Sequence, residues 1–127
     1  MAEEPRPGSI VHVELPCKDT ERAKKFYGDL FGWKFQDHPE MNYTLFEAAT
    51  PPGGGLFVPQ EGQFTPQGTL TYLLVEDVEA KAKEVEAAGG TILVPASEVP
   101  NQGWFAIFKD PEGTTMALWK SAAHPQE

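Results

Sequence analysis

The chain has 127 residues, of which 40% are hydrophobic, and a formal net charge of −9 at pH 7. This length fits one domain with its own core, and the acidic charge disfavours nucleic acid and anionic membrane surfaces as partners. A single cysteine, Cys17, excludes an internal disulfide framework and favours a reducing cytoplasm, and no run approaches the ~20 apolar residues of a membrane helix.

A strand comes first in the predicted order. Val11 and Val13 alternate with His12 and Glu14 at the period of two residues that is typical of a strand with two unlike faces. Pro16 ends this strand, because proline cannot donate to a sheet ladder. His12 and Glu14 therefore share one face of the strand, and the apolar residues occupy the other.

A helix follows the strand. Asp19 is placed to accept backbone N–H bonds as an N-cap, and Gly32 can take the left-handed conformation that ends a helix. Between them, apolar residues recur with helical spacing and predict one stripe that packs on the sheet. The stripe consists of Ala23, Phe26, Tyr27, Leu30 and Phe31.

The rest of the first half predicts short strands and turns. We expect strands at residues 33–36, 42–48 and 56–58. The segment from Pro51 to Gly55 predicts a wide turn, because proline and glycine dominate it. Residues 60–68 are polar, with glycine and proline, and predict a linker.

The pattern then begins again. We expect a strand at 70–75, a helix capped by Asp77 and ended by Gly89 and Gly90, a loop at 95–103, and strands at 91–94, 104–109 and 115–120. A shift of 58 residues places Asp19 on Asp77, which indicates an internal duplication. The sequence thus predicts an α+β fold with two tandem β-α-β-β-β modules, 9–59 and 69–120, inside a single domain of residues 1–127. The modules are expected to form a curved, largely antiparallel sheet with a cleft.

In this arrangement the chain resembles the vicinal oxygen chelate superfamily, which includes glyoxalase I, extradiol dioxygenases, and fosfomycin and bleomycin resistance proteins. The resemblance runs from about Ile10 to Trp119. It rests on His12 followed by Asp19 and AKKFYGDLFGW, on VEDVEAKAKEVEAAGG, and on GWFAIFKDPEG. It implies this fold and a homodimer, but function has to be argued from the site itself.

Members of the superfamily that carry a metal hold it with side chains from the first and last strands of each half. The positions that match here are His12, Leu70, Ala117 and one near Gly55 or Leu56. Only His12 among them can ligate an ion, and one imidazole does not hold a metal. We therefore expect no metal and no other cofactor, with Glu14 and Glu47 as conceivable replacement ligands.

The remaining candidate site residues are expected to line the cleft. By strand alternation, Tyr72 shares a face with Leu70, and Trp119 shares a face with Ala117. His12 is open to three interpretations: a metal ligand, a polar contact to a ligand in the cleft with or without proton transfer, or a hydrogen-bonded structural residue. Glu14 orients the imidazole or raises its pKa, contacts a cationic ligand group, or is a solvated carboxylate at the cleft mouth.

Three functions follow from these residues. The first is a cleft that binds a small organic molecule without a catalytic metal. The second is a metal-free enzyme in which His12, with or without Glu14, transfers a proton. The third is a metal-dependent lyase, isomerase or dioxygenase, which the missing ligands disfavour.

Overall fold

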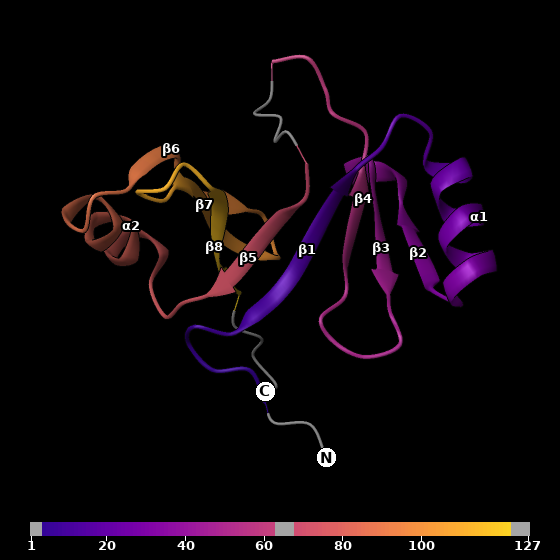
Figure 1. Cartoon of the computed structure of the whole chain (residues 1–127), viewed down its shortest axis with the longest axis horizontal. Helices are drawn as coiled ribbons and strands as arrows, with labels where there is room; N and C mark the ends of the chain where they lie inside the picture. Colours follow the sequence, from indigo (N-terminus) through magenta and orange to yellow (C-terminus); the bar gives the residue numbers. More distant parts are fainter. Residues whose placement is uncertain (1–3, 63–67, 123–127) are drawn as a thin grey trace. The chain divides into compact units, whose positions relative to one another are not determined.

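The computed structural model describes residues 4–62 and 68–122, and the chain divides into two compact units (Figure 1). The N-terminal unit comprises Val11–Thr71, and the C-terminal unit comprises Met1–Ile10 together with Tyr72–Glu127. Residues 63–67 of the predicted linker lie outside the described residues.

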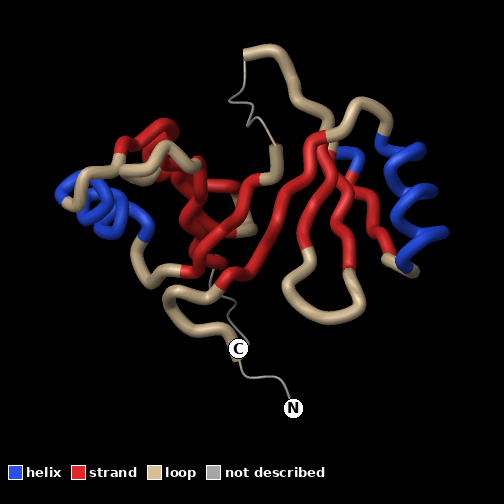
Figure 2. Tube along the Cα trace, viewed as in Figure 1, coloured by secondary structure: helices blue, strands red, loops and turns tan. Residues whose placement is uncertain are grey.

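The N-terminal unit is a four-stranded sheet with one α-helix (Figure 2). Its elements are β1 (Ile10–Pro16), α1 (Thr20–Phe31), β2 (Lys34–His38), the 3₁₀ helix η1 (Pro39–Met41), β3 (Tyr43–Glu47) and β4 (Gly54–Phe57). The strands follow the order β2-β3-β4-β1. The strand β4 pairs in parallel with β1 and antiparallel with β3, and β3 pairs antiparallel with β2.

The second half repeats this plan. Its elements are β5 (Leu70–Leu74), α2 (Val78–Ala87), β6 (Thr91–Val99), β7 (Gly103–Lys109) and β8 (Thr115–Ser121). The strand β8 pairs in parallel with β5 and antiparallel with β7, and β7 pairs antiparallel with β6. The predicted fold class is confirmed: the chain is α+β, with two tandem β-α-β-β-β modules and largely antiparallel pairing.

Local capping signals define the helices as predicted. The Asp19 side chain accepts a hydrogen bond from the backbone N–H of Arg22 at 3.1 Å, and Asp77 does the same for Ala80 at 3.0 Å. Gly32 ends α1 with a φ of 73°, in the left-handed region that favours glycine. Neither described helix has the length and apolarity that a membrane span needs.

The two helices pack differently on their sheets. The helix α2 buries Val78 and Ala82 in a cluster of aliphatic and aromatic side chains. The helix α1 has no fully buried residue, and an aromatic stack runs beneath it instead. In this stack the ring of Trp33 lies 4.7 Å from that of Tyr27 and 4.3 Å from that of Phe46, centroid to centroid.

The predicted stripe on α1 is therefore wrong in part. Phe26, Leu30 and Phe31 are 53%, 61% and 60% exposed. The side that is partly buried includes Tyr27 and Gly28, where an added Cβ would already touch the ring of Phe35 at 3.5 Å. The helix thus turns Gly28 and Tyr27 toward the sheet, and its three exposed apolar residues face away from it.

Two predicted loops are also wrong. Gly54 and Gly55, expected in a wide turn, belong to β4. The loop expected at 95–103 is strand up to Val99, because β6 continues past Pro95. The register of β6 against β7 shifts between Val94 and Ser97, where proline cannot donate to the ladder.

The unequal burial of two leucines gives a stability test. Leu56 is 1% exposed and Leu30 is 61% exposed. We expect Leu56→Ala to lower the free energy of unfolding by about 2–5 kcal/mol, because it leaves a cavity in the sheet. The matched change Leu30→Ala should cost about 0.5 kcal/mol or less. Chemical denaturation of both variants measures this, and equal costs would contradict the described packing of α1.

Candidate functional site

The two faces of the N-terminal sheet carry different chemistry. Val13 pairs with Gly54, which pairs with Phe46, so these residues share the face on which the aromatic stack lies. The residues between them in each strand point to the opposite face. On β1 these are His12 and Glu14, as the sequence predicted.

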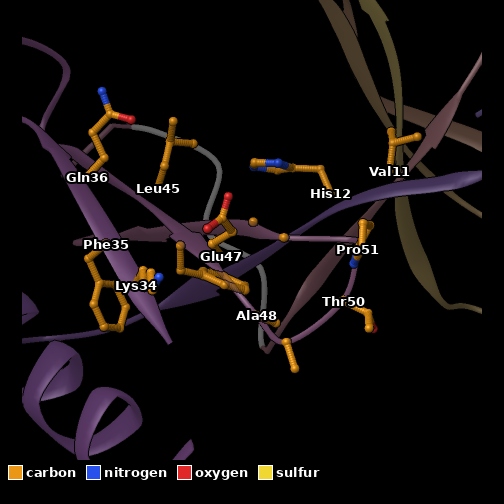
Figure 3. A pocket seen from close by; sticks show the side chains of 14 residues that line it. Val11, His12, Lys34, Phe35, Gln36, Leu45, Glu47, Ala48, Thr50 and Pro51 are labelled. Carbon is orange, nitrogen blue, oxygen red and sulfur yellow. The ribbon is translucent and has the colours of Figure 1, made fainter. Parts of the chain in front are cut away.

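A pocket of about 700 Å³ lies in this unit. It is lined by residues of β1, β2, β3 and the β3–β4 connection, among them His12, Gln36, Leu45, Glu47, Pro51 and Gly53. Figure 3 shows the side chains of His12, Leu45 and Glu47 around one space, with Gln36 at its edge. The walls thus combine apolar and polar groups in similar proportion.

A tyrosine joins the two polar residues of β1. The Tyr43 hydroxyl lies 2.6 Å from Nε2 of His12 and donates a hydrogen bond to Oε2 of Glu14 at 2.8 Å. All three side chains are partly buried. The structure therefore brings His12 and Glu14 together through Tyr43, a residue that the sequence analysis did not single out.

Gly55 makes this link possible. Tyr43 belongs to β3 and His12 to β1, and β4 runs between these two strands. A Cβ added at Gly55 would collide with the phenol ring and hydroxyl of Tyr43. The missing side chain thus leaves the space in which Tyr43 crosses the neighbouring strand. The signals in the sequence are the alternation of Tyr43 with Thr44 and the pair Gly54–Gly55, which the turn rules assign to a turn.

The imidazole of His12 is held in its neutral form near neutral pH. Burial lowers the pKa of His12 from its ordinary value of 6.5, because the charged ring loses hydration inside the protein. A neutral imidazole keeps one protonated and one basic nitrogen, so it can both donate and accept a hydrogen bond.

The predicted residues of the second half share one sheet face. Tyr72 pairs with Ala117 across β5 and β8, and the Trp119 ring meets the Tyr72 ring edge-on, with centroids 6.4 Å apart. Leu70, Tyr72 and Ala117 are 2%, 7% and 0% exposed. These side chains lie in β5 and β8, and their predicted place in one cleft with His12 and Glu14 stays a prediction.

The described side chains do not fit the metal site of the superfamily. No three His, Cys, Asp or Glu side chains within residues 4–62 and 68–122 are grouped so that they could hold an ion. Leu70 and Ala117 offer no donor atom, and the Tyr43 phenol fills the space of a side chain at position 55. Nε2 of His12, the atom at the tip of the ring, is engaged by the same phenol.

Comparison with known proteins identifies the family. A family described as bleomycin resistance protein-like N-terminal matches residues 9–49. A glyoxylase-like domain-containing protein of Didymella fabae is 34% identical over 118 residues, which cover 87% of this chain and 92% of that protein. The chain belongs to the glyoxalase-like proteins of the vicinal oxygen chelate superfamily.

Other glyoxalase-like relatives are longer than this chain. CFP32 of Mycobacterium bovis, which bears a provisional glyoxylase name, is 30% identical over 135 residues. The match covers 94% of this chain but 48% of that protein, so the chain spans about half the length of the first curated relatives it matches.

The fold is shared with solved structures. Methylmalonyl-CoA epimerase from Streptomyces coelicolor, in complex with 2-nitronate-propionyl-CoA, superposes with a TM-score of 0.67 at 17% identity. The superposition covers 93% of this glyoxalase-like chain and 97% of the epimerase. At this identity the likeness concerns the fold alone.

The depressed pKa of His12 makes the stability of the protein depend on pH. Below pH 6.5 the unfolded chain binds a proton at His12 that the folded chain does not, so stability falls as the pH falls toward the folded midpoint. We expect His12→Asn, which cannot titrate, to lose less stability than the wild type between about pH 7.5 and about pH 5.5. Urea denaturation at both pH values measures the difference. Equal losses in the two proteins would contradict the burial of the imidazole.

Proposed function

We propose that this glyoxalase-like chain binds a small organic molecule in the pocket of its N-terminal unit, with His12 as a polar contact. The observation that carries the proposal is a pocket of about 700 Å³ with an imidazole in its wall. Small-molecule pockets are commonly about 300–1,000 Å³. Leu45, Ala48 and Pro51 supply apolar surface here, and His12 and Gln36 supply hydrogen-bonding groups.

The charges around the pocket favour a ligand without multiple negative charges. Lys34 is the cation among the lining residues, and it pairs in register with Glu47 on the neighbouring strand. His12 adds no positive charge near neutral pH, because burial lowers its pKa. The chain as a whole carries a net charge of −9. Recognition by hydrogen bonds and apolar contact is therefore proposed, rather than the ion pairing that a polyphosphate requires.

The proposal includes the setting of this site. Residues 1–127 are proposed to act as a single domain, with modules at 9–59 and 69–120, in a cytoplasmic homodimer. The single cysteine supports the cytoplasmic location, and the superfamily resemblance supports the dimer. Sedimentation velocity of the full chain distinguishes a dimer from a monomer.

Ligand binding is tested by thermal-shift screening followed by titration. A ligand present at 100 times its Kd should stabilise the protein by about 2.7 kcal/mol. We expect His12→Ala to weaken binding of the same compound about 10-fold, because it loses a buried hydrogen bond. Leu45→Trp should also weaken it, because the larger side chain intrudes into the pocket. Tyr27→Phe, in the aromatic stack on the other face, is the control, and unchanged affinity in both pocket variants would refute the proposal.

A second candidate function is metal-free proton transfer by His12. The observation that favours it is the hydrogen-bonded series His12–Tyr43–Glu14, in which a base is oriented by further side chains. Proton transfer would exchange an acidic hydrogen of the ligand or convert the ligand outright. Binding alone would return the ligand unchanged.

The two functions are separated by NMR of the bound compound in deuterated water. An enzyme should exchange or convert the ligand, and His12→Ala should slow this by about 100-fold or more. A ligand that is recovered without deuterium after prolonged incubation supports the binding protein. Metal analysis of untagged protein accompanies the assay, and a stoichiometric divalent ion that disappears in His12→Ala would overturn both functions.

A further inference from the structure

The hydrogen bonds of Tyr43 determine where its single proton lies. Its hydroxyl contacts Nε2 of His12 at 2.6 Å and Oε2 of Glu14 at 2.8 Å. A carboxylate can only accept hydrogen bonds, so the hydroxyl proton points at Glu14. The oxygen of Tyr43 then turns a lone pair toward His12, and only a proton on Nε2 completes a hydrogen bond there.

This proton placement decides the state of the imidazole. A neutral imidazole has one N–H, and with the proton on Nε2 the lone pair is on Nδ1. The opposite tautomer would place two lone pairs against each other at 2.6 Å. Burial works in the same direction, because it disfavours the doubly protonated, charged ring.

The path of Tyr43 across β4 is part of the fold. The ring planes of His12 and Tyr43 differ by 13°, and Gly55 supplies the space that the phenol occupies. Glycine in a strand interior weakens the strand, since it has no side chain to pack and loses more backbone freedom on folding. Here that cost is offset by a tyrosine held between two polar side chains of β1.

We propose that Tyr43 is a positioning residue. Its hydroxyl donates to the Glu14 carboxylate and accepts a hydrogen bond from Nε2 of His12, and it thereby holds the imidazole in the Nε2–H tautomer. A ligand group that bonds to Nδ1 must then donate the hydrogen. The inference rests on the proposed binding function for its ligand class, namely small molecules with a hydroxyl, an N–H or an acidic C–H group. The tautomer itself is independent of any ligand.

The tautomer is measured by ¹⁵N NMR of the labelled full chain near neutral pH, with His12 assigned from its absence in His12→Asn. We expect wild-type Nε2 to show the shift of a protonated nitrogen and Nδ1 that of an unprotonated one. Tyr43→Phe should abolish this distinction and give a mixture of tautomers. Tyr27→Phe, which also loses one tyrosine hydroxyl, should leave the His12 signals unchanged.

Gly55→Ala provides a second route to the same test, because the added methyl group displaces the phenol without removing it. It should shift His12 toward the Tyr43→Phe pattern. If this variant does not fold, Glu14→Gln replaces it, since a carboxamide no longer requires the hydroxyl proton. A wild-type His12 protonated on Nδ1, or a tautomer unchanged in Tyr43→Phe, would overturn the inference.

The ligand class is tested with phenol and anisole, two probes of similar shape of which only phenol can donate a hydrogen bond. Phenol should perturb the Nδ1 shift of His12 in the wild type, and anisole should not. An equal effect of anisole would overturn the requirement for a donor. If neither probe changes the Nδ1 shift while the tautomer is as expected, the proposed binding function loses support. The role of Tyr43 then stands.

Discussion

The packing of ring side chains from β3 against two glycines of β4 is the constraint on which the N-terminal unit depends. Gly54 and Gly55 carry no side chains, so rings from β3 occupy the space on both faces of β4. On one face, a Cβ at Gly54 would meet the ring of Phe46 at 2.7 Å; on the other, a Cβ at Gly55 would meet Tyr43. The ring of Phe46 is part of the stack beneath α1, and the hydroxyl of Tyr43 contacts His12. One pair of glycines therefore supports both the attachment of the helix and the polar site.

The C-terminal unit uses a related device for a different purpose. Gly103 makes room for the indole of Trp119, which belongs to the neighbouring strand β8. The face of its sheet that does not pack on α2 carries Tyr72 and Ala117 rather than a histidine with a carboxylate. The two copies of the plan share caps, strand order and a ring packed on a glycine. The faces compared here differ, because His12 and Glu14 make one polar while Leu70 and Ala117 make the other largely apolar. Of the positions that match metal ligands in the superfamily, only His12 carries a ligating side chain, and its Nε2 contacts the Tyr43 hydroxyl.

The features that could be predicted from the sequence are those with a local cause. Asp19 and Asp77 cap helices through bonds to residues three positions away, and strand alternation placed His12 and Glu14 on one face. Tyr43 could not be found in this way, because its partners lie 31 and 29 residues distant and depend on the register of three strands. The orientation of α1 was missed for a similar reason. Helical periodicity identifies an apolar side, but the stack on Trp33 decides which residues of that side meet the sheet.

The aromatic stack under α1 has a further, optical consequence. The indole of Trp33 lies between the rings of Tyr27 and Phe46, and the residue after it, Lys34, is in the pocket wall. We therefore expect the fluorescence of Trp33 to respond to small movements of β2 and β3. The other two tryptophans, Trp104 and Trp119, belong to the C-terminal unit. A chain with phenylalanine at those two positions would emit from Trp33 alone, and its spectrum would follow the pocket without any attached dye.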